Sequence, residues 1–470
     1  MHPEAKQWAR EEFGHVELGD ERRRKRLVMM AAQAASNPSG RVSDVFVVGA
    51  ERQAAYDFLE APADQAEPMA TAMGRACATR AAVHSFVFAP VDGTSLTLVD
   101  RAQTKDFGGI GPYMHGARGL KVIDAIAVSP DGVPLGIGAL QWWARGEEPL
   151  RRSHKSRKVH EKETLHWLDA VDQMAARFAE YAPSTRLWFQ LDREADARSL
   201  LQHLDASGHW FTVRSRSNRR LQDASRRRYL RDVLRRRPIL GDELLEVPAR
   251  PGQRCRLASM RIRAASVTLR LRDQWTKTTR QLQINAVWVR ESSATVPRGE
   301  QALEWILLTN HPIDTIEDAK LVVFGYTQRW RIEDFHKAWK SGVCDVESTQ
   351  LQAKAHVIKW ATLLAAVAMR VERLKQLARE QPTLPASTEL SKNEIEALIL
   401  LKRKYKKRTE EIPDSMPTIA QATLWIAELG SYTGKSSGGP PGSITIGRGL
   451  ERVLMAAEGI AAWKSSRKKR

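Results

Sequence analysis

Cysteine is scarce in this sequence. The 470 residues include 3 cysteines, Cys77, Cys255 and Cys344, and these lie far apart along the chain. Such spacing excludes a disulfide framework and does not resemble the paired cysteines of a zinc site. Low cysteine use is typical of a protein in a reducing compartment.

Long hydrophobic runs are also lacking. The uncharged apolar stretch from Trp360 to Met369 reads as a buried helix, because a membrane span needs roughly 20 apolar residues. The first residues, Met1 to Lys6, contain no apolar core of a signal peptide. We therefore expect a soluble cytoplasmic protein with no membrane partner.

Acidic residues are in deficit. Lys and Arg number 74 against 55 Asp and Glu, which gives a formal net charge of +19. With 42% hydrophobic and 27% charged residues, the composition is that of a globular protein and excludes a largely disordered or fibrous chain. The positive excess favours a polyanionic partner, and without membrane features we predict that this partner is nucleic acid.

The length suggests about three domains at roughly 150 residues each. Residues 1 to about 75 read as helical, with Asp20 placed to cap a helix that opens on the basic run Glu21 to Arg26. A second helix is expected from Ala50 to Leu59. The basic run alone is also compatible with a solvated helix face.

The pattern changes to strands from residue 85. We expect the strands and helices Phe86–Val91, Val122–Val128, Val133–Leu140, Glu161–Tyr181 (helix), Leu187–Leu191, Ala195–Leu204 (helix) and Trp210–Val213. Ser129 to Gly132 is a strong turn signal between the second and third strands. The first three strands are predicted to form a meander and the later ones to add in parallel, which is an α/β fold.

The remainder alternates between strand and helix patterns. Between about 215 and 310, alternation from Val267 to Arg272 and from Leu282 to Trp288 predicts strands with one buried and one polar face. Helix is expected with interruptions from Ala319 to Lys407. A loop from Thr433 to Gly442, a short helix and a basic tail, Arg467 to Arg470, are expected after it.

Two aspartates stand out by position. Asp92 follows the strand Phe86–Val91, and Asp192 follows Leu187–Leu191. Carboxylates at the carboxyl ends of neighbouring parallel strands project into the crevice where α/β sheets bind ligands. Together they could hold a hard divalent cation. A single aspartate at a strand end is more often a turn former or a helix cap, and it is the pair that favours a ligand site.

A third acid comes from helical geometry. If residues 326–340 form one helix, at about 100° per residue Tyr326, Arg329, Glu333 and Lys340 share an arc of about 60°. The apolar Ile332, Phe335 and Trp339 then lie on the opposite side. An exposed helix with an Arg329–Glu333 ion pair is the simpler alternative, although Trp330 on the polar front needs something to stack on. Three such carboxylates suit two-metal phosphoryl transfer with Mg²⁺.

These residues resemble the catalytic signature of the insertion-sequence-four family of bacterial DDE transposases, which includes the transposon-five transposase. The family's Tyr, Arg, Glu and Lys match Tyr326, Arg329, Glu333 and Lys340 at every spacing. Asp192–Asp196 is similar to the second motif and Asp92–Leu96 to the first, with Gly93 where the best-known member has Thr. The likeness extends over essentially the whole chain, through Trp8, Leu18–Asp20, Ala54–Tyr56, Val213–Ser215 and Trp305–Thr309.

The resemblance implies an architecture. A ribonuclease-H-like core, with a mixed five-stranded sheet and helices, would span residues 76–375 and carry a β insert at about 215–310. A helical domain at 1–75 would bind transposon ends, and a helical domain at 376–470 would dimerise.

The resemblance also implies an activity: a homodimer cutting and pasting double-stranded DNA in the bacterial cytoplasm, at the nucleoid. It would bind terminal inverted repeats, cleave through a hairpin on the transposon end, and join the 3′-hydroxyls to target DNA. Asp92, Asp192 and Glu333 would hold two Mg²⁺, for which Mn²⁺ would substitute. The implied DNA-binding residues are Arg22, Arg23, Arg26, Arg214, Trp305, Tyr326, Arg329, Trp330, Lys337 and Lys340.

Two alternatives remain open. One is a catalytically inactive DNA-binding regulator derived from a transposase, against which the retained acids argue. The other is a ribonuclease-H-like nuclease, against which the basic N-terminal helix and the Tyr–Arg–Glu–Lys spacing argue.

Overall fold

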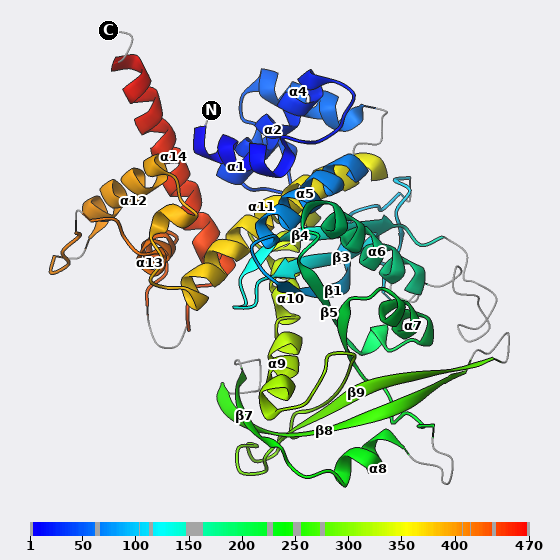
Figure 1. Cartoon of the computed structure of the whole chain (residues 1–470). Helices are drawn as coiled ribbons and strands as arrows, with labels where there is room; N and C mark the ends of the chain where they lie inside the picture. Colours follow the sequence, from blue (N-terminus) through cyan, green and yellow to red (C-terminus); the bar gives the residue numbers. More distant parts are fainter. Residues whose placement is uncertain are drawn as a thin grey trace.

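The computed structural model shows a mixed α/β protein with one large sheet and helices on both of its faces (Figure 1). The structure describes residues 3–61, 66–102, 104–111, 116–146, 163–222, 229–247, 255–272, 278–406, 408–413, 415–434 and 439–467. None of the helices in these ranges is both long and apolar enough to cross a membrane.

The chain begins with helices, as expected. They are α1 (Pro3–Phe13), α2 (Glu21–Ser36), α3 (Val42–Val45), α4 (Gly49–Glu60) and α5 (Ala66–Ala81). Asp20 caps α2 as predicted, because its side chain accepts a hydrogen bond from the Arg22 amide at 2.8 Å. α5 runs across residue 75, where the first domain was expected to end.

Five strands form the middle of the molecule: β1 (Phe86–Thr97), β3 (Arg118–Val128), β4 (Pro134–Trp143), β5 (Arg186–Leu191) and β6 (Trp210–Arg214). β3 pairs antiparallel with both β1 and β4, which confirms the meander. β5 adds parallel to β1, and β6 adds parallel to β5, as predicted. Helices α6 (Thr164–Tyr181) and α7 (Arg198–Ala206) connect them. The first two residues of the expected helix, Glu161 and Lys162, lie outside the described residues.

The sheet separates two hydrophobic layers. Side chains of β1 alternate between them, with Phe88 and Leu96 in one layer and Val87 and Val91 in the other. The first layer includes buried residues between 319 and 369, together with the N-terminal helices, and the second includes α6 and α7. Polar residues of β1 on the Phe88 side therefore face the helices that follow residue 316.

The sheet is larger than the predicted five strands. Short β2 (Gly108–Gly109) pairs with β3, and the insert adds β7 (Gly241–Val247), β8 (Arg256–Arg272), β9 (Thr279–Glu291) and β10 (Glu304–Thr309). β10 pairs antiparallel with β6, so the insert continues the same sheet instead of forming a separate one. A short helix, α8 (Leu230–Arg235), packs on β8.

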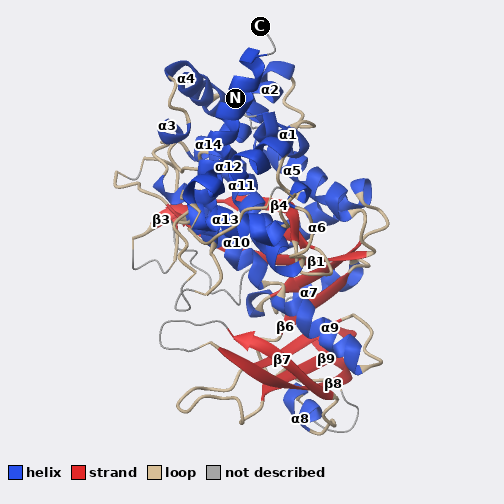
Figure 2. Cartoon of the chain, turned by 90° about the vertical axis from the view of Figure 1, so that its left-hand side faces the viewer, coloured by secondary structure: helices blue, strands red, loops and turns tan. Residues whose placement is uncertain are grey.

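Helices dominate the last third of the chain. They are α9 (Ile316–Thr327), α10 (Trp330–Lys340), α11 (Lys354–Glu380), α12 (Lys392–Tyr405), α13 (Ile419–Leu429) and α14 (Ser443–Arg467). Figure 2 shows the N-terminal and C-terminal helices gathered at one end of the molecule, with the strands of the insert at the other. α11 runs across residue 375, the other expected domain boundary.

Two helix predictions were wrong. Residues 326–340 do not form one helix, because α9 ends at Thr327 and α10 begins at Trp330. The helix after the loop at 433–442 is not short, since α14 has 25 residues and packs on α12 and α13. Residues 435–438 of that loop and 468–470 of the basic tail lie outside the described residues.

Candidate active site

The strand pairing brings the two aspartates together. β1 and β5 are in parallel register, with Val91 opposite Leu191, so Asp92 and Asp192 are the next residues on adjacent strands. Asp192 follows the end of β5 as predicted, and its side chain accepts a hydrogen bond from the Glu194 amide at 2.7 Å.

The prediction that Asp92 ends a strand was wrong. β1 continues to Thr97, because its other edge stays paired with β3, where Asp92 lies opposite Asp124. Asp92 therefore marks the point at which β1 loses its parallel neighbour, and its carboxylate faces the layer that contains α10.

Arg329 connects Asp92 to Glu333. Its Nη1 donates to Oδ2 of Asp92 at 2.8 Å, and its Nη2 donates to Oε1 of Glu333. The Arg329 side chain is 10% exposed, whereas that of Glu333 is 46% exposed. The Arg329–Glu333 ion pair of the alternative reading is thus present, but it belongs to a three-membered bridge that reaches the sheet and is buried at Arg329.

Burial and neighbouring charges together set the proton affinities of Asp92 and Arg329. It raises the pKa of Asp92 to about 6, against the lowering effect of Arg329 and with a further raising effect of Asp192. Burial alone would lower the pKa of Arg329, but Asp92, Tyr326 and Glu333 outweigh it and raise that pKa. Arg329 is therefore a permanent cation among acidic groups.

The carboxylates suit a hard cation by their chemistry. Within the described ranges, however, no group of three or more His, Cys, Asp or Glu side chains lies close enough together to hold a metal ion. The guanidinium of Arg329 contacts two of the three expected ligands. Asp92, Asp192 and Glu333 therefore fit a metal by donor type, and Arg329 has to leave Asp92 and Glu333 before they can share one.

The Tyr–Arg–Glu–Lys set is split by the break between α9 and α10. Tyr326 is 3% exposed, and its ring centroid lies 6.0 Å from the Arg329 guanidinium. Lys340 points to β1, with Nζ 3.3 Å from Oγ1 of Thr94 and 3.7 Å from Oε1 of Glu347. The four side chains therefore do not form the single exposed front that one continuous helix predicts.

The apolar side of α10 was predicted correctly. Ile332, Phe335 and Trp339 are each 0% exposed. Glu333 and Lys337, in contrast, are exposed on the same helix.

Two tryptophans adjoin this site. The Trp305 ring centroid lies 5.5 Å from that of Tyr326 and 6.0 Å from that of Trp330. Trp305 is 6% exposed, so its indole is packed rather than presented to solvent. Arg214 at the end of β6 acts on Tyr326 electrostatically, lowering a pKa that burial raises. Trp330 thus does have an aromatic partner, and it is Trp305.

A buried acid–base pair was missed by the sequence reasoning. Oδ1 of Asp124, on β3, lies 2.7 Å from Nε2 of His336, on α10. Burial lowers the pKa of His336, but Asp124 and then Asp92 outweigh it and raise that pKa. A lone charge inside the apolar run Val122 to Val128 was the signal that could have found Asp124.

The expected end-binding residues lie at the start of α2. Arg22 and Arg23 are exposed and Arg26 is half-buried. Their neighbour Arg24 is held by Glu21. The basic surface predicted here therefore exists, at the far side of the molecule from the insert strands (Figure 1).

The N-terminal helices are similar to a known protein family. Residues 5–63 match the family model Transposase DNA-binding. The matched segment contains α1 to α4 and all three arginines of α2. It supports a transposase, with DNA as its partner.

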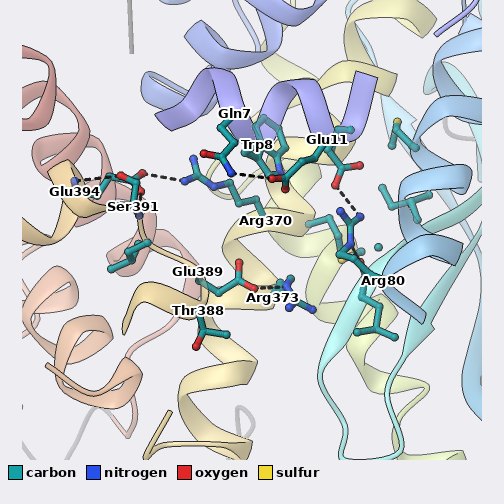
Figure 3. Close-up of a pocket in the computed structure, with 18 of the residues that line it drawn as sticks. Gln7, Trp8, Glu11, Arg80, Arg370, Arg373, Thr388, Glu389, Ser391 and Glu394 are labelled. Atoms are coloured by element: carbon teal, nitrogen blue, oxygen red, sulfur yellow. Dashed lines mark hydrogen bonds and ion pairs between the residues drawn. The ribbon is translucent and has the colours of Figure 1, made fainter. Parts of the chain in front are cut away.

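A separate crevice lies between this segment and the core (Figure 3). It has a volume of about 290 Å³ and lies between α1, β4, α11 and the start of α12. Ion pairs cross it: Arg80 with Glu12 at 2.7 Å, Arg370 with Glu394 at 2.9 Å, and Arg373 with Glu389. The first pair joins α1 to α5, and the other two join α11 to residues at or just before the start of α12. None of the predicted acids lines the crevice, so it is not the candidate site.

Proposed function

We propose that this protein is a cut-and-paste DNA transposase of the DDE type. The observation that carries the proposal is the register of β1 and β5, which makes Asp92 and Asp192 neighbours, together with the Arg329 bridge to Glu333. The transposase DNA-binding match at residues 5–63 supports DNA as the substrate.

The strand order supports a ribonuclease-H-like core. β4, β3 and β1 are antiparallel, and β5 and β6 add in parallel beyond β1. This arrangement is the one that the family resemblance implies, with β7 to β10 as the insert. Residues 1–75 would then bind transposon ends, 76–375 would catalyse, and 376–470 would dimerise.

Asp92, Asp192 and Glu333 would hold two Mg²⁺ ions, with Mn²⁺ as a substitute. When bound, the ions activate the attacking oxygen and stabilise the leaving oxygen of a phosphodiester. Arg329 would have to release both carboxylates for them to hold an ion, and its guanidinium would then be free to bind a phosphate of the DNA, for which its forked donors are suited.

The side chains around the acids would hold the DNA. Lys340 would contact phosphates near the cleaved bond, and Arg214 and Lys337 would extend this contact. Tyr326, which is 3% exposed, could join them only once it is uncovered. Trp305 and Trp330 would stack against a base displaced during hairpin formation, each stack contributing about 1–3 kcal/mol. Since Trp305 is buried in the present structure, it must become accessible when DNA binds.

Arg22, Arg23 and Arg26 would contact the terminal inverted repeats. Two ends are joined to one target, so the active form is proposed to be a homodimer on DNA, at the bacterial nucleoid.

Cleavage of end DNA tests the proposal. The DNA is taken from the inverted repeats that flank the gene. We expect Mg²⁺-dependent cleavage and hairpin formation by the wild type, and none by Asp92→Asn, Asp192→Asn or Glu333→Gln, all of which should still shift the DNA in a gel. Wild-type cleavage by any of the three would overturn the assignment.

One observation favours a second candidate, an inactive DNA-binding regulator. Arg329 holds Asp92 and Glu333, and the described residues contain no three-ligand cluster. For this candidate, the same assay gives end binding by the wild type without cleavage in either Mg²⁺ or Mn²⁺.

A further inference from the structure

Asp124 and His336 lie next to two of the proposed catalytic carboxylates, those of Asp92 and Glu333. Asp124 is the cross-strand partner of Asp92, and the Cβ atoms of such partners are about 4.5–5.5 Å apart. His336 follows Glu333 by three residues on α10, so both project from neighbouring positions on one side of the helix. The Asp124–His336 contact therefore joins β3, the strand beside Asp92, to α10, the helix that carries Glu333.

Apolar side chains flank the pair on both elements, although Asp92 and Lys340 are near enough to act on His336 electrostatically. Asp124 is 0% exposed and His336 is 9% exposed, and the flanking residues Val122, Ile126 and Phe335 are buried in the same hydrophobic cluster. A buried ion pair in such a place is often no more stabilising than apolar side chains of similar volume. The pair is thus better explained by what it orients than by stability.

Asp124 depends on His336 for its position. Its Oδ2 is buried and has no hydrogen-bond partner among the described residues, while Oδ1 is held by Nε2 of His336 at 2.7 Å. Loss of the imidazole would leave a buried carboxylate with neither oxygen held by a side chain, which is costly.

The Arg329 bridge cannot fix the acids during the reaction. It joins Asp92 to Glu333 directly, but those same oxygens must be freed for the ions. A contact that persists has to come from residues that are not ligands, and Asp124 and His336 satisfy this condition.

We propose that Asp124 and His336 are positioning residues, whose hydrogen bond fixes α10 against β3 and so sets the place of Glu333 relative to Asp92. Neither side chain touches the DNA or the ions. The inference rests on the proposed function and adds to it the contact that preorganises the site.

Replacement of the pair by apolar side chains separates positioning from stability. The double variant Asp124→Leu/His336→Leu should fold with a Tm near that of the wild type and should bind end DNA normally. Its Mn²⁺ affinity in the end-DNA complex, measured by electron paramagnetic resonance, should fall about tenfold, as is usual when the support of a metal ligand is lost. Its cleavage rate should fall with it.

A matched variant keeps the hydrogen bond without the charges. In Asp124→Asn/His336→Gln, the amide nitrogen of Gln takes the place of Nε2 and donates to the Asn oxygen. We expect Mn²⁺ affinity and cleavage close to those of the wild type. An affinity loss in this variant as large as that of the leucine pair would overturn the proposal, and so would wild-type affinity in the leucine pair. If the leucine pair does not fold, Asp124→Asn/His336→Leu takes its place in the comparison, because it differs from the Asn/Gln variant only in losing the hydrogen bond, and wild-type Mn²⁺ affinity in it would overturn the proposal.

Asp92→Asn, measured in parallel, separates the two failures. If Asp92→Asn is inactive while the leucine pair behaves as wild type, the positioning inference alone is wrong. If Asp92→Asn cleaves as wild type does, the proposed function is wrong and the inference falls with it.

Discussion

Nη1 of Arg329 donates a hydrogen bond to Oδ2 of Asp92 at 2.8 Å, although the two residues are 237 positions apart in the sequence. The same guanidinium reaches Glu333. In this structure a side-chain cation thus lies among the acids where the proposed chemistry needs metal cations. The exchange of one for the other is the step on which the proposed activity depends.

Removal of that guanidinium should make the protein depend on metal for stability. In Arg329→Ala, the Asp92 carboxylate, which is 19% exposed, loses its charged partner, and we expect the free energy of unfolding to fall by about 1–3 kcal/mol. Mg²⁺ should recover part of this loss, because an ion that binds only the folded protein stabilises it. Urea denaturation with and without Mg²⁺ measures both effects.

Arg331→Ala is the matched control. Arg331 lies two residues further on, in the first turn of α10, and pairs with Glu380, which is about a third exposed. Such a pair contributes at most about 1 kcal/mol, and its loss should be insensitive to Mg²⁺. An equal Mg²⁺ effect in the two variants would count against the exchange.

The stability of the protein should depend on pH through the titration of Asp92. Burial raises the pKa of Asp92 from its ordinary 3.8 to about 6. Between about pH 4 and 6 the folded protein holds a proton that the unfolded chain releases, so this group's contribution to stability falls as the pH rises.

Asp92→Asn removes that titration. The free energy of unfolding of the wild type minus that of the variant should become less favourable from pH 4 to pH 7, by about 1–3 kcal/mol at 1.36 kcal/mol per pKa unit. Denaturation across this range without metal gives the difference directly. A difference that grows more favourable with pH would show that the carboxylate titrates below its ordinary value.

End recognition should depend on the exposed arginines of α2. Arg22→Ala should weaken binding to the terminal repeats and reduce the slope of log K against log salt by about one, as expected for one lost phosphate contact. Gel shifts at several salt concentrations measure this, and cleavage at saturating protein should be unchanged.

Arg24→Ala serves as the comparison for Arg22→Ala. Arg24 is in the same turn of the helix, but Glu21 holds it, so its loss should alter end affinity much less. Equal losses in the two variants would mean that the net charge of α2 matters and not the individual contacts.

Strands and turns were predictable where a single pattern decides them. The strand Leu187–Leu191 ends at Asp192 because the Asp192 side chain accepts a hydrogen bond from the Glu194 amide and caps the short turn Arg193–Ala195, and the turn at Ser129–Gly132 needs only its own residues. Asp92 was misplaced because β1 has two neighbours of different extent, and the run Phe86–Val91 reflects only the stretch that pairs with β5, whereas pairing with β3 continues to Thr97.

The break between α9 and α10 could not be read from periodicity. Gln328 and Arg329 form hydrogen bonds to residues three before them, with the Arg329 amide 3.1 Å from the Tyr326 carbonyl. Such a tight turn preserves the spacing of apolar residues while it rotates α10 relative to α9. The Arg329 bridge and the Asp124–His336 pair were also out of reach, because they join residues whose contact depends on how α10 packs on the sheet.

A crystal structure of the full protein bound to its end DNA and Mn²⁺ tests the central claim most directly. Anomalous scattering at the manganese edge locates the ions without reference to the protein. We predict manganese peaks bound by Asp92, Asp192 and Glu333, with the Arg329 guanidinium turned onto a DNA phosphate. End DNA bound with Arg329 still between Asp92 and Glu333, and no manganese there, would contradict the account.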